Sequence, residues 1–423
     1  MRAACWHNRC PMKKYHIATL GCRTNQYESQ LFSDQLRRMG YEPAPEDEAD
    51  LCIINTCSVT DSAEASSRRQ IRNLARRHPN ARLIVTGCMA ESSQKAILAI
   101  DPRIEVFPNK DKEQLVSFLF PEEKNRTGLS IERFDGHTRA FVKVQDGCNS
   151  FCSYCIIPYV RGRSRSRSVA EIIQEVRTLT ANGYREIVLT GVNVGDYAAD
   201  GASLADLVRA VDRVKGIQRV RISSIDPTDV NEDLAGAILN GLHTCPNLHL
   251  VLQSGSNVVL KRMNRKYSRQ IFLKTVEGLV NKNKDFTFTT DVIVGFPNES
   301  EADFAETLDV VRQVRFAKVH VFPYSVRSRT RAALDPHPVP QDVIAQRKEE
   351  LLRLADQVAF DLRQQYLHRT MDVLLEEGKG DVLSGHTSNF ITVEVPRGSH
   401  GPNQLVQVEM LENSPDGIKG RIL

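Results

Sequence analysis

The sequence lacks any long hydrophobic run. None of its apolar stretches approaches the roughly 18 consecutive residues that a membrane-spanning helix requires. The amino-terminal letters MRAACWHNRCPMKK are basic, but no apolar segment follows them, so the pattern does not indicate a secretory signal. We therefore expect a cytoplasmic protein with no membrane partner.

A strong excess of charge of one sign is also absent. The net charge is +4 and the pI is about 8.5, which permits a nucleic-acid partner without arguing for one. With 41% hydrophobic and 26% charged residues, the composition is typical of globular proteins. A length of 423 residues predicts two or three domains.

Cysteine, by contrast, is plentiful, with ten residues. In a reducing compartment, cysteines are more often metal ligands or catalytic groups than disulfide partners. Met12 is a possible alternative start, so residues 1–11, with Cys5 and Cys10, are expected to be an extension. The sequence assigns no role to these two residues or to Cys245.

The pattern of apolar residues divides the chain into three predicted domains. Residues 12–124 alternate strands at 16–20, 51–55, 82–86 and 104–107 with helices at 30–39, 63–77, 93–100 and 112–120, which predicts an α/β fold with an open parallel sheet. Residues 134–366 contain six further strand–helix units, which predict a partial (βα)6 barrel. Its strands are expected at 140–144, 186–190, 219–224, 248–253, 286–294 and 317–324.

Residues 367–423 show short alternating strands without helices, at 370–375, 390–395, 405–410 and 417–423. This pattern predicts a small all-β barrel, a kind of module that often binds RNA. The alternative is a stabilising cap that binds no ligand.

Cys148, Cys152 and Cys155 form a C-x3-C-x2-C motif directly after the first strand of the predicted barrel. A structural zinc site normally takes four protein ligands, whereas three thiolates on a [4Fe–4S] cluster leave one iron open to another molecule. The loop after the first strand also lies at the carboxyl-terminal mouth of a barrel, where such folds place their chemistry. The motif therefore predicts an iron–sulfur site.

A second set of cysteines is spread over the amino-terminal domain. Cys22, Cys57 and Cys88 each follow the carboxyl end of a predicted parallel strand, and these ends share one edge of the sheet. Helices begin nearby, and their amino termini stabilise thiolates. The alternative is three buried structural cysteines. We favour a second [4Fe–4S] cluster that also has an open iron.

With Tyr154 just before its last cysteine, the C-x3-C-x2-C motif resembles the radical S-adenosylmethionine (SAM) signature. The order of the three domains resembles the methylthiotransferases of that superfamily, and GHTSNFITVEVP is similar to the central strands of their TRAM domain. This resemblance implies two [4Fe–4S] clusters and SAM in two roles, as methyl donor and as source of a radical. It also implies an electron donor such as a flavodoxin or ferredoxin, and a sulfur source.

Several segments resemble the branch of this family that modifies N6-threonylcarbamoyladenosine in tRNA. They include GCRTNQYESQ, IVLTGVNVGDY, TTDVIVGFPNESE and HVFPYSVRSRT, although Thr24 stands where valine is expected. The implied reaction is methylthiolation of C2 of this adenosine at position 37. The alternatives are isopentenyladenosine in tRNA, a ribosomal protein, or a non-catalytic iron–sulfur protein that binds RNA.

Further candidates lie at the strand ends of the predicted barrel. Tyr154, Gly191, Asn193, Ser223, Gln253 and Asp291 are the predicted SAM-binding residues, since a polar cofactor needs polar groups in an otherwise apolar barrel. Each has an alternative role as a turn or cap residue. Arg161, Arg163, Arg165 and Arg327 are predicted to contact RNA phosphates. The alternative for the first three is a phosphorylatable Arg-Ser tract.

Overall fold

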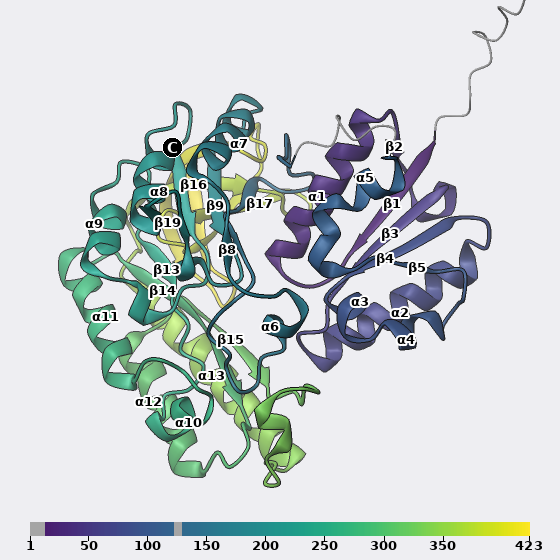
Figure 1. The fold of residues 1–423 in the computed structure, drawn as a ribbon. Coiled ribbons are helices and arrows are strands. Elements are labelled where there is room, and N and C mark those ends of the chain that lie inside the picture. The colour runs from purple at the N-terminus through teal and green to yellow at the C-terminus, as the bar shows by residue number, and fades with distance from the viewer. Residues whose placement is uncertain (1–12, 122–128) are drawn as a thin grey trace, which may run out of the picture. The chain divides into compact units, whose positions relative to one another are not determined.

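The computed structural model describes residues 13–121 and 129–423, and these fall into two compact units (Figure 1). The first extends to Arg133 and includes Tyr159–Gly162, whereas the second comprises Phe134–Pro158 and Arg163–Leu423. Cys5 and Cys10 lie outside the described residues. None of the described helices is both long enough and apolar enough to cross a bilayer.

The first unit is an open, five-stranded, fully parallel sheet in the order β2-β1-β3-β4-β5. Its strands are β1 (Lys14–Thr19), β2 (Glu42–Pro43), β3 (Leu51–Thr56), β4 (Arg82–Gly87) and β5 (Glu105–Val106). Helices α1 (Arg23–Arg38) and α5 (Leu115–Leu119) cover one face, and α2 (Asp61–Arg77), α3 (Cys88–Ser92) and α4 (Gln94–Leu98) cover the other (Figure 1). The predicted sheet is confirmed.

Strand β3 explains how this sheet buries both of its faces. Ile53 packs with the core under α1 and α5, whereas Cys52 and Ile54 pack with the core under α2 and α3. Such a continuous apolar run is typical of a parallel strand that is covered on both sides. Helix α1 begins seven residues earlier than predicted, because its first turns are buried through polar residues such as Asn25 and Glu28, which leave no apolar periodicity.

The second unit contains the predicted partial barrel of six parallel strands. These are β6 (Arg139–Lys143), β9 (Glu186–Thr190), β12 (Arg219–Ile222), β13 (Asn247–His249), β14 (Thr287–Val294) and β15 (Lys318–Pro323). They form two three-stranded sheets joined by bridges at Val220–Thr244 and Ile225–Leu250. No strand pairing between β6 and β15 is found in the described chain, so the barrel is open on that side.

Six long helices follow these strands: α7 (Val169–Ala181), α8 (Leu204–Asp212), α9 (Glu232–Asn240), α11 (Arg269–Lys282), α12 (Glu301–Val314) and α13 (Gln341–Gln364). Ser168, Ser203 and Ser300 begin α7, α8 and α12 with complete capping boxes, which satisfy backbone N–H groups at the helix start. These local signals help to explain why a helix follows each strand, as the six predicted strand–helix units require.

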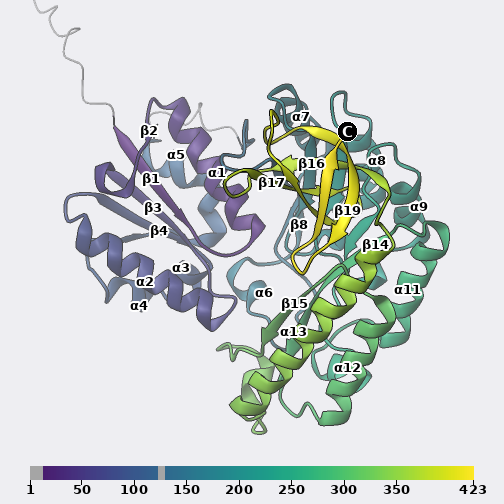
Figure 2. The ribbon, with the colours of Figure 1, turned by 180° about the vertical axis from the view of Figure 1, so that it is seen from behind.

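The second unit ends in a closed barrel of five strands, in the order β16-β17-β18-β20-β19 (Figure 2). The strands are β16 (Thr370–Glu376), β17 (Val382–Thr387), β18 (Thr392–Pro396), β19 (Leu405–Asn413) and β20 (Ile418–Ile422). The predicted all-β barrel is confirmed, but β17 was missed. Its Gly385 interrupts the apolar pattern, and a Cβ there would lie 2.5 Å from the carbonyl oxygen of Leu374 on the paired strand.

Residues 386–390, called the plug turn below, include the last two residues of β17 and the turn that leads to β18. They pack against the amino ends of the partial-barrel strands. Arg219 donates to the carbonyl oxygens of His386 (2.7 Å) and Asp372 (2.8 Å). Arg221 donates to those of Thr387 and Ser388, both at 2.8 Å, and its Nε donates to Glu186 (2.6 Å). Two arginines of β12 therefore hold the closed barrel through its backbone.

Two other strands, β6 and β14, also contact the plug turn through their first residues. The Phe390 ring lies 5.5 Å from the guanidinium of Arg139, the first residue of β6, and stacks on His386 at 4.6 Å. Thr287, the first residue of β14, donates its hydroxyl to the Asn389 carbonyl oxygen. The plug turn thus covers the end of the barrel that faces away from the predicted chemistry.

Substitution of Arg221 by alanine tests this contact. Glu186 is fully buried, and although burial works in the opposite direction, Arg221, Arg139 and Arg219 hold its pKa below the ordinary value. Removing one partner of a buried ion pair should lower the free energy of unfolding of this unit by about 3–5 kcal/mol. Urea unfolding followed by circular dichroism measures the change. The exposed Arg213→Ala in the same unit should stay within about 0.5 kcal/mol, and equal effects of both variants would contradict the assignment.

Candidate functional site

Cys148, Cys152 and Cys155 lie in the loop after β7 (Gln145–Asp146), which continues from the carboxyl end of β6. Burial, together with the neighbouring Cys152 and Cys148, raises the pKa of Cys155 to about 12. Burial also raises the pKa of Cys148, and Cys152 contributes there as well. The three thiols therefore share one small, largely buried volume.

Hydrogen-bond donors surround these thiols. The backbone N–H of Ser150 donates to Cys148 Sγ (3.4 Å), and Nη1 of Arg265 donates to Cys152 Sγ (3.1 Å). Arg265 is itself held by an ion pair with Asp226 and by a contact of its Nε with the Tyr267 hydroxyl at 3.1 Å. N–H donors beside thiolate ligands tune iron–sulfur clusters, so this set of residues fits a cluster held by three thiolates.

Gln145 connects the cysteine loop to the turn after β9. Its Oε1 accepts from the backbone N–H groups of Val192 (3.0 Å) and Asn193 (2.9 Å), and its Nε2 donates to the Gly147 carbonyl oxygen (2.7 Å). A Cβ at Gly191 would lie 2.9 Å from the carbonyl oxygen of Gln145, so only glycine fits there. The sequence interpretation missed Gln145, whose signal is a polar residue inside a short buried strand.

The other predicted SAM residues lie near the same mouth. The Tyr154 ring contacts Phe296 edge-on at 6.4 Å. Ser223, just past β12, and Gln253, beyond β13, each bury a side-chain oxygen that has no hydrogen-bond partner. Buried polar atoms of this kind normally have a partner, so these two fit a polar ligand. Asp291 differs, because its carboxylate lies 3.3 Å from Nε2 of His249.

The structure also brings Cys22, Cys57 and Cys88 together in the first unit. Burial, together with Cys88 and Cys22, raises the pKa of Cys57 to about 12. Gly21 has a φ of +97°, and a Cβ there would lie 2.8 Å from Cys57 Sγ. The loops after β1, β3 and β4 thus meet at one edge of the sheet.

A buried charge network lies beside these cysteines. Glu28 accepts from Arg161 Nη1 (3.0 Å) and pairs with Lys112 Nζ (2.7 Å), and all three side chains are almost completely buried. Arg161 also donates to Asn25 Oδ1 at 2.5 Å. Burial raises the pKa of Cys88, whereas Arg161 and Lys112 act in the opposite direction. This network thus places two cations around one buried carboxylate.

This geometry corrects two of the predicted RNA contacts. Arg161 is 2% exposed and forms an ion pair with Glu28. Arg327 is 5% exposed, and its Nη2 donates to Ser325 Oγ at 2.7 Å. A buried guanidinium offers no surface to a phosphate. Arg163 and Arg165 are exposed, as a phosphate contact requires.

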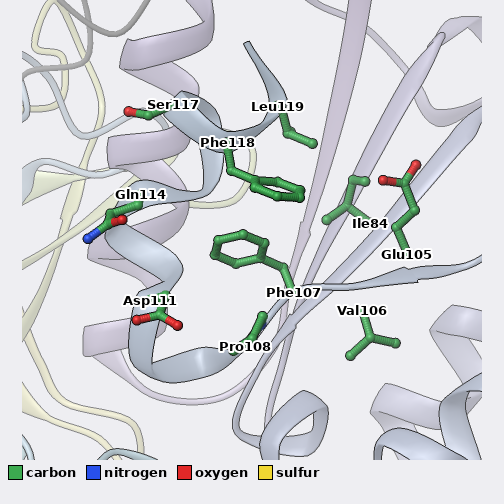
Figure 3. A pocket seen from close by; sticks show the side chains of 10 residues that line it. All are labelled: Ile84, Glu105, Val106, Phe107, Pro108, Asp111, Gln114, Ser117, Phe118 and Leu119. Carbon is green, nitrogen blue, oxygen red and sulfur yellow. The ribbon is translucent and has the colours of Figure 1, made fainter. Parts of the chain in front are cut away.

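One cavity of the first unit lies away from the candidate residues. It has a volume of about 590 Å³ and lies between β5 and residues 109–119 (Figure 3). Phe107 and Phe118 both line it, and their tilted rings are in contact, with centroids 5.1 Å apart. None of the predicted site residues lines it, so this cavity is not part of either cysteine site.

Two family models match the chain, one within each of the first two predicted domains. Residues 14–108 match the family described as "Uncharacterized protein family UPF0004", and residues 142–311 match the "Radical SAM superfamily". The first match contains Cys22, Cys57 and Cys88, and the second contains Cys148, Cys152 and Cys155.

Similar proteins extend over nearly the whole chain. The chain is 47% identical over 412 residues to a threonylcarbamoyladenosine tRNA methylthiotransferase, MtaB, of Chlamydia pneumoniae, covering 97% of this chain and 98% of the relative. The Thermotoga maritima protein of the same name is 37% identical, covering 96% of each chain. A tRNA-2-methylthio-N(6)-dimethylallyladenosine synthase of Caldicellulosiruptor saccharolyticus is 36% identical, covering 97% of this chain and 93% of the relative.

Among solved structures, the radical SAM methyltransferase TsrM of Kitasatospora setae is similar in fold. It is 12% identical with a TM-score of 0.55, covering 76% of this chain and 77% of that one. This likeness concerns the fold alone. The two matched families and the extended identity to curated relatives show that the chain belongs to the radical-SAM methylthiotransferases.

Proposed function

We propose that the protein methylthiolates C2 of N6-threonylcarbamoyladenosine at position 37 of tRNA. The observation that carries this proposal is the 47% identity to a relative named for this reaction, in a chain with two separate groups of three thiols. The dimethylallyladenosine synthases, at 36% identity, support the alternative substrate less strongly.

The thiols of the C-x3-C-x2-C motif serve the radical chemistry. As a member of the radical-SAM superfamily the protein takes a [4Fe–4S] cluster and SAM, which together supply the radical when bound. Cys148, Cys152 and Cys155 would hold the cluster. Tyr154, Gly191, Asn193, Ser223 and Gln253 would surround SAM, with Gln145 fixing the turn at Asn193.

The second group, Cys22, Cys57 and Cys88, would hold a second [4Fe–4S] cluster that carries the sulfur to be transferred. The cations of Arg161 and Lys112 support this, because they lower the pKa of Cys88 against the effect of burial, and a cluster with thiolate ligands is negative overall. Arg161 is thus reassigned from an RNA contact to a counter-charge for these thiols. An electron donor such as a flavodoxin or ferredoxin and a sulfur source complete the requirements.

The tRNA would be bound in part by Arg163 and Arg165 and by the closed barrel, which we propose to be a TRAM-like domain of residues 367–423 after domains at 12–124 and 134–366. Arg219 and Arg221 already occupy the plug turn, so RNA would meet other surfaces of that barrel. Phosphate contacts make binding fall steeply with salt. The requirement for tRNA favours a cytoplasmic location.

The substrate is tested by nucleoside analysis of tRNA from cells that lack the gene. We expect 2-methylthio-N6-threonylcarbamoyladenosine to disappear and its unmethylthiolated precursor to accumulate, because the proposed reaction supplies the C2 sulfur. A plasmid-borne copy should restore the product. An unchanged amount of this nucleoside, or the loss of a methylthiolated isopentenyladenosine instead, would overturn the assignment.

The second cluster is tested by Cys57→Ala. After anaerobic reconstitution, the wild type should contain about eight irons per chain and the variant about four, because one of the two clusters loses a ligand. The variant should still form 5′-deoxyadenosine from SAM but transfer no methylthio group. Cys52→Ala, a substitution of the buried cysteine inside β3, serves as the control and should keep about eight irons. Equal iron in the wild type and Cys57→Ala would contradict the second cluster.

Gln145→Ala tests the support of the SAM site. The substitution removes the acceptor of two backbone N–H groups in the turn at Asn193, so we expect the KM for SAM to rise about 10-fold or more while about eight irons remain. Gln357→Ala on the exposed face of α13 is the matched control. An unchanged KM would show that this turn does not position SAM.

A further inference from the structure

Three titratable side chains converge on adjacent strands of the partial barrel. They are His249 on β13, Asp291 on β14 and His320 on β15, and one nitrogen or oxygen atom from each lies within 4.8 Å of the other two. The imidazoles of His249 and His320 have ring centroids 5.9 Å apart. We call these residues the His-Asp-His cluster.

The alternation of β14 places this cluster inside the barrel. Side chains at every second residue of a strand point to the same face. Thr287 contacts the plug turn at the amino end, and Ile293 packs with Tyr154 beside Cys155. Asp291 lies between them on the same face, so the cluster faces the interior between the plug turn and the cysteine loop.

The side chains of the cluster present polar atoms to this interior. Nδ1 of His249 is held by the Thr289 hydroxyl at 2.9 Å, which directs Nε2 toward Asp291. Nε2 is buried and has no well-aligned hydrogen-bond partner, although the Asp291 carboxylate lies 3.3 Å away. Buried polar atoms without such a partner are costly unless a ligand completes them.

We propose that the His-Asp-His cluster binds the polar substituent on N6 of the substrate adenosine; this rests on the proposed function. In adenine, C2 and C6 flank N1, so a base whose C2 reaches the SAM site brings its N6 substituent into the same interior. The threonylcarbamoyl group carries a carboxylate, a hydroxyl and ureido N–H groups. The imidazole N–H groups donate to the carboxylate, and Asp291 accepts from the hydroxyl or an N–H.

This chemistry lets the cluster discriminate between substituents on N6 of the adenosine. A dimethylallyl group has neither charge nor hydrogen-bonding atoms, so burying it here would desolvate the cluster and leave its polar atoms unpaired. Sites built to hydrogen-bond a substrate reject analogues that lack the matching group. The cluster therefore favours the threonylcarbamoyl substrate over an alkylated adenosine. Asp291, predicted from sequence to bind SAM, is assigned to the substrate instead.

The test is a competition between two tRNAs in one reaction with the reconstituted full-length enzyme. One tRNA carries N6-threonylcarbamoyladenosine and the other isopentenyladenosine, and mass spectrometry measures the ratio of their methylthiolated products. We expect His320→Gln and His249→Gln to lower this ratio about 10-fold or more, the effect of losing one charge-assisted hydrogen bond. Because the ratio is taken within each reaction, a partial loss of folded enzyme does not affect it.

His243→Gln, a substitution in the loop before β13, is the matched control and should keep the wild-type ratio. An unchanged ratio in both His320→Gln and His249→Gln would overturn the inference while the proposed function stands. A wild type that leaves the threonylcarbamoyl tRNA unmodified would overturn both. Two imidazoles and a carboxylate also suit a divalent metal ion, so Zn²⁺ and Mn²⁺ are tested by equilibrium dialysis. Stoichiometric binding by the wild type that His320→Gln abolishes would replace the substrate with a metal ion.

Discussion

Parallel strand pairing is the constraint on which both cysteine sites depend. In the first unit β1, β3 and β4 run in one direction, so the loops carrying Cys22, Cys57 and Cys88 leave the sheet at the same edge. An antiparallel partner would have sent one of these loops to the opposite edge. In the second unit the same rule places the loop after β6 with the turns after β9 and β12, which supply the polar groups around Cys148, Cys152 and Cys155.

The same direction of the strands gives the two ends of the partial barrel different tasks. The carboxyl ends carry the thiols and unpartnered oxygens of Ser223 and Gln253, whereas the amino ends are covered by the plug turn. Arg221 and Glu186 make this cover specific, since each buried charge requires the other, and Arg221 also requires the plug-turn carbonyls. These directed hydrogen bonds therefore fix the closed barrel at the amino ends of the partial-barrel strands.

Sequence reasoning reached the parts of this molecule that local patterns determine. The cysteine motifs, the apolar strands and the capped helices are each determined by short segments of sequence. The open sheet, the partial barrel and the closed barrel could therefore be predicted from them. Features that depend on distant contacts were missed. Strand β17 was missed because Gly385, which packs against Leu374, interrupts its apolar pattern, and Arg161 looked like a surface residue because nothing near it in sequence reveals Glu28. Three strands have to be aligned before His249, Asp291 and His320 meet.

Both groups of thiols share an electrostatic requirement, and an arginine lies beside each group. Burial raises the pKa of Cys57 and Cys155, so the protein scaffold alone favours neutral thiols, whereas a cluster requires thiolates. A nearby cation opposes the effect of burial, and arginine stays charged even when it is buried. Arg265 lies beside one group and donates a hydrogen bond from Nη1 to Cys152 Sγ. At the other group, Arg161 and Lys112 lower the pKa of Cys88 against the effect of burial, and each of them does so by more than Glu28 raises it.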